Sequence, residues 1–221
     1  MKNNKLDSFE LEDLNFSLEE FEKTYSINFS QEELNNILTF KDLSEVIINK
    51  FEYENVTDCT SQQAFYKVKN ILQTINPKIS SITPHTPLED LIPRKNRRLT
   101  IKAVEAQIGF DLNLLRPRKV FISFLMALSL STFILLFFNF WYAWILGAFS
   151  YSFYRVIFEN SNEFKFKTVR ELVENIMQEH YFLIRREPNT MNKEEFKKIV
   201  LNWFSDKMDM DKERMRMTRF V

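Results

Sequence analysis

Residues 120–154 form the longest apolar stretch in the chain. No Asp, Glu, Lys, Arg or His interrupts these 35 residues, although 27% of the whole chain is charged. One helix of that length would span roughly 52 Å at about 1.5 Å per residue, well beyond a hydrocarbon core of roughly 30 Å. The pattern therefore predicts two membrane passes, 120–138 and 144–158, joined by a turn at 139–143 that carries interface-type aromatic residues.

Two alternatives to the membrane hairpin stay open. A pair of buried helices in a soluble core would also be apolar, although the length and the aromatic edges favour the membrane. The second pass is short and carries Arg155 in its last turn, so a re-entrant or tilted segment is the other alternative.

Outside the apolar stretch, the spacing of apolar residues is helical. Steps of three and four residues predict amphipathic helices near 11–25, 42–51, 65–75, 100–110 and 196–204. Capping-box spacing at Ser17–Glu20 and Ser30–Glu33 predicts that helices start or restart there. Four prolines between residues 77 and 93 indicate a loop.

The helical segments contain an internal repeat of three aligned pairs. Residues 39–48 match 168–177 in the order Thr, apolar, basic, acidic, Leu, any, Glu, any, Ile. The other two pairs are 25–29 with 110–114 and 65–71 with 196–202. Amphipathic helices match one another by coincidence often, but three pairs in a consistent order favour a true repeat.

Residues 62–114 carry a family resemblance. They resemble the first half of an acyl carrier protein: an amphipathic helix, a loop ending in Thr-Pro-Leu-Glu-Asp-Leu at 86–91, and a second helix closing in Gly-Phe-Asp-Leu at 109–112. The resemblance implies that the apolar hairpin interrupts the domain after its second helix and that 168–177 is its final helix. Two passes then return both parts of the domain to the same side of the membrane.

The resemblance departs from the carrier pattern at the attachment serine. Carriers follow the Glu-Asp-Leu with an Asp-Ser-Leu whose serine bears phosphopantetheine, whereas this chain has Ile-Pro-Arg-Lys-Asn-Arg-Arg-Leu at 92–99. Charging at that position is therefore not expected. Asp7-Ser8-Phe9 is a second match, and it makes Ser8 the one candidate phosphopantetheine site. Because Ser8 lies about one helical turn too far from Tyr25, we favour the alternative that Asp7 and Ser8 cap the first helix.

These matches predict an all-α protein with two small carrier-like bundles and a two-helix transmembrane hairpin. The N-terminal fifty residues resemble the second half of a carrier-like unit, and 194–221 resemble a first helix with its loop. The two chain ends are therefore expected to meet, within one chain or across a homodimer. The expected segments are 1–57 and 190–221 for one unit, 58–118 and 163–185 for the other, and 119–158 for the hairpin.

Charge is divided unevenly although the net charge is zero. An acidic surface for a protein partner is expected on the first helix, at Glu10, Glu12, Asp13, Glu19 and Glu20. A basic surface for lipid headgroups or an acidic protein is expected around the start of the hairpin, at Arg94, Lys95, Arg97, Arg98, Arg116, Arg118 and Lys119. Because basic flanks lie on the cytoplasmic side, both chain termini are expected there. The bland alternative is that the two surfaces pair with each other inside the molecule.

Composition excludes several classes of protein. Two glycines in 221 residues disfavour a β-sandwich, a P-loop and a dinucleotide fold. A single cysteine rules out an intramolecular disulfide framework and fits a reducing compartment. The two histidines lack metal-ligand spacing, and the balanced charge does not suggest nucleic-acid binding. No catalytic constellation is present, so neither an enzyme nor a cofactor is expected.

The sequence thus predicts a non-enzymatic scaffold or recruitment protein on the cytoplasmic face of a bacterial inner membrane. Its partners would be the bilayer and a second protein. Two other functions stay open: a membrane immunity protein that neutralises a toxin of a contact-dependent secretion system, and a true carrier charged at Ser8.

Overall fold

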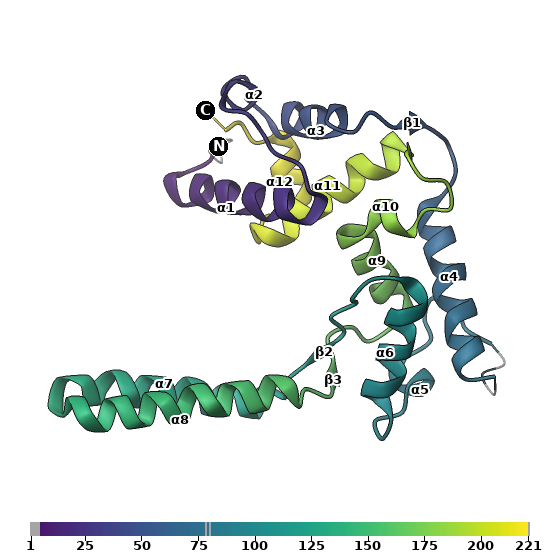
Figure 1. The fold of residues 1–221 in the computed structure, drawn as a ribbon. Helices are drawn as coiled ribbons and strands as arrows, with labels where there is room; N and C mark the ends of the chain where they lie inside the picture. Colours follow the sequence, from purple (N-terminus) through teal and green to yellow (C-terminus); the bar gives the residue numbers. More distant parts are fainter. Residues whose placement is uncertain (1–4, 78, 80, 221) are drawn as a thin grey trace. The chain divides into compact units, whose positions relative to one another are not determined.

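The computed structural model describes residues 5–77, 79 and 81–220, and it belongs to the all-α class, as predicted. The outermost bounds of the expected segments, at residues 1–4 and 221, lie outside the described residues. The chain forms two compact units: unit 1 comprises 1–68 and 173–221, and unit 2 comprises 69–172. Figure 1 shows the elements of both units.

Unit 1 gathers elements from both ends of the chain. Its helices are α1 (Ser8–Tyr25), α2 (Gln31–Asn35), α3 (Phe40–Asn49), α10 (Tyr181–Ile184), α11 (Lys193–Lys207) and α12 (Lys212–Met217). The short strands β1 (Glu54–Asn55) and β4 (Thr190–Met191) pair in parallel.

Unit 2 contains the apolar hairpin. Its elements are α5 (Leu88–Leu91), α6 (Arg97–Ile108), β2 (Leu115–Arg116), α7 (Lys119–Phe138), α8 (Phe140–Glu159) and β3 (Glu163–Phe164). Helices α4 (Thr60–Ile75) and α9 (Val169–Glu179) run through the boundary, so each contributes residues to both units.

The two ends of the chain pack together in the core of unit 1. Phe21 of α1 lies 5.6 Å from Trp203 and 5.6 Å from Phe204 of α11, between ring centroids, and Phe40 of α3 lies 5.7 Å from Phe204. Phe21 and Phe204 are fully buried. Removing each such side chain from water contributes roughly 1.5–3 kcal/mol. The predicted contact between the two chain ends is therefore confirmed, within a single chain.

Backbone hydrogen bonds close unit 1 at its edge. The Leu6 N–H donates to the Arg219 carbonyl over 3.1 Å, and the Phe220 N–H donates to the Leu38 carbonyl over 2.8 Å. Unit 2 has the same connection made from an internal loop: the Leu88 N–H donates to the Lys167 carbonyl over 2.9 Å. In both cases the bonded segment leads directly into a helix that starts after a threonine, Thr39 or Thr168.

Helices α3 and α9 confirm the first pair of the predicted repeat. Their buried positions coincide along both helices: Phe40, Leu43, Ser44, Ile47 and Ile48 in α3, and Val169, Leu172, Val173, Ile176 and Met177 in α9. Each starting threonine also accepts a hydrogen bond from the backbone three residues later, at Asp42 or Glu171. Sequence and structure therefore agree on the register of this pair.

Helices α1 and α6 form the second pair, but their register differs from the predicted one by two residues. Both helices end in a left-handed residue, Ser26 with φ 54° and Gly109 with φ 97°. Glu22 accepts a hydrogen bond from the N–H seven residues later, over 2.6 Å, and Glu105 does the same over 2.9 Å. The alignment of Tyr25 with Phe110 was therefore wrong, because an aromatic residue was matched where the helix end sets the register.

Helices α11 and α4 form the third pair, shifted by one residue from the prediction. The buried positions Ala64, Val68, Ile71 and Leu72 of α4 correspond to Phe196, Val200, Trp203 and Phe204 of α11. This register explains two expectations that were wrong. Carrier-like packing of 62–114 predicts that Phe65, Leu72, Leu91, Val104 and Phe110 lie in the core. Phe65 and Phe110 are only half-buried, because the neighbouring positions face inward. Leu72, Leu91 and Val104 are buried as expected.

The apolar hairpin occupies, in unit 2, the place that α2 has in unit 1, between the second and third repeated helices. Helices α7 and α8 lie side by side, and β2 and β3 pair antiparallel at their base (Figure 1). The expected turn at 139–143 was too long. Asn139 alone breaks the helix, with φ −156° and ψ 104°, and its side chain then caps α8 by accepting from the Tyr142 N–H.

One helix, α7, is long and apolar enough to cross a membrane, and none of its residues is buried against protein. Helix α8 also has 20 residues but carries Tyr, Trp and Ser side chains with Arg155 near its end. It is long enough to cross a membrane but not apolar enough, so α7 is the one helix of the described residues that meets both conditions. No membrane is present, so these are properties of the helices alone.

Helix α1 corrects one more expectation. It runs without a break from Ser8 to Tyr25, so no helix restarts at Ser17. The Ser17 hydroxyl donates to the Asp13 carbonyl over 2.7 Å instead, which an uninterrupted helix permits. The capping box that forms is Asp7 with Glu10, and the predicted box of Ser30 with Glu33 starts α2.

Candidate interaction surfaces

The acidic residues predicted on the first helix divide into two groups. Glu10 pairs with Arg214 over 2.6 Å, and Glu20 pairs with Lys207 over 2.6 Å. These two carboxylates hold α1 against α12 and α11 inside unit 1. The prediction that Glu10 and Glu20 face a partner is therefore corrected, because basic residues near the end of the chain already occupy them.

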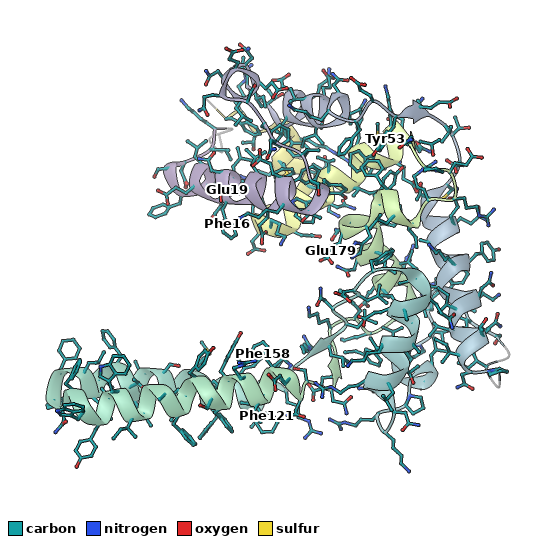
Figure 2. The ribbon with its side chains drawn as sticks, viewed as in Figure 1. Phe16, Glu19, Tyr53, Phe121, Phe158 and Glu179 are labelled. Carbon is teal, nitrogen blue, oxygen red and sulfur yellow. The ribbon has the colours of Figure 1, made fainter. Side chains whose placement is uncertain are left out.

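The remaining acidic residues share the outer face of α1 with two phenylalanines. Glu12, Asp13 and Glu19 are exposed. Phe9 is 76% exposed and Phe16 is 62% exposed. Steps of three and four residues place these side chains on one face, and Figure 2 labels Phe16 and Glu19 on it. We call this set, Phe9, Glu12, Asp13, Phe16 and Glu19, the acidic aromatic face.

Arg97 is a structural residue and not part of an exposed basic surface. It is only 3% exposed, and its guanidinium lies 4.1 Å from the Phe164 ring centroid. It donates to the Asn162 carbonyl over 2.6 Å and to the Ile92 carbonyl over 3.3 Å, and it pairs with Glu89 over 3.4 Å. The expected headgroup role of Arg97 is corrected, because α6 turns this side chain inward at a position where α1 has buried Leu14.

Three other residues of the predicted basic surface line a pocket in unit 2. The pocket has a volume of about 690 Å³, and Arg94, Lys95 and Arg98 lie on its wall with Lys102 one turn further along α6. The last turn of α8, at Phe158 and Glu159, forms another part of the wall. Lys102 was not part of the predicted basic surface, although it lies four residues after Arg98 on the same face of α6.

The basic residues at the start of the hairpin lie near its base. Arg118, between β2 and α7, pairs with Glu163 of β3 over 3.4 Å. This ion pair ties the segment before the hairpin to the strand that follows it. Arg116 is half-buried in β2, whereas Lys119 is exposed as the first residue of α7. Lys119 is therefore the one member of this trio that is both exposed and without a carboxylate partner in the described part of the chain.

Ser8 is exposed as the first residue of α1. Asp7 precedes it as the N-cap, and the Asp7 carboxylate accepts from the Glu10 N–H over 2.8 Å. The expectation that this pair marks the helix start is confirmed for Asp7. The Ser8 hydroxyl has no base within hydrogen-bonding distance among the described residues, so nothing in its surroundings activates it as a nucleophile.

A buried polar network in unit 1 was not anticipated from the sequence. The Arg185 guanidinium pairs with Asp58 over 2.5 Å and donates to the hydroxyls of Thr60 and Tyr181. Glu195 accepts from the Thr60 N–H over 3.0 Å. Burial raises the pKa of the Tyr181 hydroxyl, so this group stays a neutral donor.

This network holds the start of α4 in place. The Glu195 carboxylate caps α4 from a distant part of the sequence, and Arg185 fixes the segment that precedes α4. No local pattern marks Arg185, because two of its partners, Thr60 and Asp58, lie 125 and 127 positions away. Among the described residues, no group of His, Cys, Asp or Glu is arranged to hold a metal ion.

The comparisons with known proteins add no relative to this picture. A scan of protein-family models, a search of curated proteins and a search of solved structures each found no match to the chain. The likeness to acyl carrier proteins therefore depends on the quoted residues alone, and the structure shows the class of the fold: an all-α protein with an apolar helical hairpin inserted into one of two repeated units.

Proposed function

We propose that the chain is a non-enzymatic, membrane-anchored scaffold built from two acyl-carrier-like units. The hairpin of α7 and α8 would be a two-pass anchor that keeps both units on the cytoplasmic face of a bacterial inner membrane. The acidic aromatic face of α1 would receive a protein partner with a basic surface.

One observation carries the anchor: the protein itself buries none of the 20 residues of α7. Exposed apolar side chains at this density are typical of a surface that meets lipid or another protein. Helix α8 supports two passes because it has the same length and packs along α7, with Gly147 facing Thr132. Its tyrosines and tryptophans suit the interfacial ends of a pass, and Arg155 lies close enough to its end for the side chain to reach the headgroups.

The repeat supports the carrier-like units. Each has a first helix, a loop that bonds to the segment before the third helix, and a second helix with a left-handed end. The lack of a serine at 92–99 favours recruitment over carriage of an acyl group. Incubation with coenzyme A and a phosphopantetheinyl transferase tests this choice: a mass adduct that disappears in Ser8→Ala would establish a charged carrier instead.

The anchor is tested with two matched substitutions. Leu130 in the middle of α7 and Leu183 in α10 are each 61% exposed. Leu130→Arg should reduce the fraction that resists carbonate extraction, because an arginine at the centre of a pass costs about 2.5–3.5 kcal/mol. Leu183→Arg should leave that fraction unchanged. Equal extraction of both variants and the parent would refute the anchor.

Recruitment is tested on the outer face of α1. A double substitution, Glu12→Lys with Glu19→Lys, reverses charge at two exposed positions and leaves the inward pairs of Glu10 and Glu20 intact. After crosslinking in native membranes, a partner band seen with the parent should be absent both in this variant and in Phe16→Ala. Bands that persist in both variants would place the partner on another surface. The control, Glu32→Lys, changes charge on α2 of the same unit.

A further inference from the structure

We infer that the basic pocket of unit 2 binds the phosphate group of an anionic phospholipid. The inference concerns Arg94, Lys95, Arg98 and Lys102, and it rests on the proposed membrane anchor for the source of the ligand. Its chemistry, the binding of a phosphate by clustered cations, is independent of that anchor.

The pocket carries an excess of positive charge that the protein does not neutralise. Four basic side chains line it, against two carboxylates, Glu105 and Glu159. Both carboxylates are engaged, since Glu105 accepts from the Leu112 N–H over 2.9 Å and Glu159 pairs with Arg155 over 3.2 Å. None of the four cations has a carboxylate within ion-pairing distance in the part of the chain that the structure describes. An anion would therefore find unopposed charge there.

The start of α6 adds a second reason for an anion. Asn96 is the N-cap but makes no side-chain cap bond, and the first turn contains no acidic residue. Helix N-termini carry partial positive charge, so cations gathered at one destabilise it unless an anion is present. Helix α1, the repeat partner of α6, starts in the opposite way, with a capping box of Asp7 and Glu10.

The apolar part of the pocket indicates a lipid. Leu99 is 73% exposed and Phe158 is 44% exposed, and both lie on the pocket wall. Phe158 belongs to the last turn of α8, and Figure 2 labels it at the end of the hairpin near Phe121. The pocket wall thus combines cations, apolar side chains and the last turn of a hairpin helix. With the hairpin as the membrane anchor, such a pocket would lie at the depth where headgroups meet acyl chains. A volume of about 690 Å³ is in the range of small-ligand sites.

Charge reversal within the repeat supports a separate ligand for this face. The register of α1 and α6 aligns Phe16 with Leu99 and Glu19 with Lys102, and Lys95, at the position of Glu12, lies in the turn just before α6. The outer surface at these positions is thus acidic in the unit without the hairpin and basic in the unit that contains it. A lipid surface accounts for the basic copy, because anionic headgroups attract basic side chains close to the membrane.

The test uses the full chain in neutral detergent and native mass spectrometry. Phosphatidylglycerol is the probe, phosphatidylcholine is the zwitterionic comparison, and inorganic phosphate and glycerol 3-phosphate are the soluble competitors. Arg94→Gln, Arg98→Gln and Lys102→Gln together should weaken phosphatidylglycerol binding roughly 10- to 100-fold. Lys193→Gln, Lys198→Gln and Lys212→Gln, which remove the same charge from unit 1, should leave it unchanged. Lys102→Glu alone, at one exposed site, should weaken it in the same direction.

Three results would overturn the inference. Binding of phosphatidylglycerol equal in the parent and in the pocket variants would do so. Complete displacement by inorganic phosphate at equimolar concentration would assign the pocket to a free anion. A loss of dimer mass in the pocket variants, without a change in lipid binding, would assign the basic face to the acidic aromatic face of a second copy. Because binding is measured in detergent, failure of the anchor in the Leu130→Arg experiment is a distinct outcome.

Discussion

Helices α1 and α6 are the same element of a repeat, yet they differ in a consistent way. Their inward positions coincide, with Leu18 matching Ile101 and Phe21 matching Val104, all buried. Their outward positions are opposite in charge, with Glu19 matching Lys102. The difference teaches that packing fixes the inner face of the repeat, whereas each outer face follows the surroundings of its own unit.

The largest expected effect breaks the shared inner face. Phe21→Ala should lower the free energy of unfolding by about 3–5 kcal/mol, because it removes a fully buried ring between Trp203 and Phe204. Val104→Ala at the equivalent position removes a smaller side chain and should cost about 1.5–3 kcal/mol. Urea denaturation followed by circular dichroism measures both. Phe16→Ala on the outer face is the control and should stay within about 0.5 kcal/mol of the parent.

The second substitution concerns an inward position where the two helices carry side chains of different chemistry, Leu14 and Arg97. Arg97→Leu gives α6 the residue that α1 has at Leu14, but it leaves the carbonyls of Ile92 and Asn162 without their donor. Unpaired buried acceptors should lower the free energy of unfolding of unit 2 by about 1–3 kcal/mol.

The matched control for Arg97 is Arg98→Leu, which removes an exposed guanidinium and should be nearly neutral. Hydrogen exchange of the α6 amides would report the change locally. An increase in stability for Arg97→Leu would show that the desolvation cost of the guanidinium exceeds the contribution of its bonds.

A smaller effect tests whether the two helix ends are equivalent. Glu22→Ala and Glu105→Ala each remove a carboxylate that accepts a hydrogen bond from the backbone seven residues later. Each should lower the free energy of unfolding of its own unit by about 1.5 kcal/mol. Glu12→Ala, at an exposed position without such a bond, is the control. Unequal losses at Glu22 and Glu105 would contradict the common register.

The sequence predicted the repeated helices but misplaced two of the three registers. Thr39 and Thr168 were aligned correctly because a capping threonine and a following acidic residue are a local signal. Phe65 and Phe110 were misplaced because an amphipathic helix has an apolar residue within one or two positions of almost any point. The type of a side chain therefore does not determine the register between two such helices.

The two interaction surfaces were predicted only in outline. The sequence showed the clusters of like charge but not which of their members bond within the protein. Glu10 and Glu20 form ion pairs with other helices of unit 1, and Arg97 is buried. Burial of a long charged side chain depends on partners far along the chain, which no local pattern reveals. The same reason hid Arg185 and its network.

The smallest expected effect depends on pH and concerns the element that only unit 1 has. Lys50 lies 2.7 Å from Glu33 of α2, and its hydrogen bond lowers the pKa of that carboxyl from 4.5 to about 2. A pKa lowered by folding adds stability that is present above pH 4.5 and is lost as the pH falls toward 2. Glu33→Gln should therefore destabilise unit 1 slightly at neutral pH and not at pH 2.

The measurement for Glu33 is thermal unfolding across that pH range. Glu32→Gln changes the neighbouring carboxylate, which has no ion pair among the described residues, and should show no such dependence. A difference between parent and Glu33→Gln that grows as the pH falls would contradict the assignment.

The hydrogen bond between Leu6 and Arg219 can form only after Arg219 has been translated, so unit 1 closes late during synthesis. Helix α1 is made first, but its packing partners α11 and α12 are made last. At 5–20 residues per second, roughly 10–40 s separate the translation of Leu6 from that of Arg219. Throughout that interval Leu14, Leu18 and Phe21 have no α11 to cover them, and the hairpin of α7 and α8 leaves the ribosome before unit 1 can close. The apolar side of α1 thus stays exposed until α11 and α12 have been made.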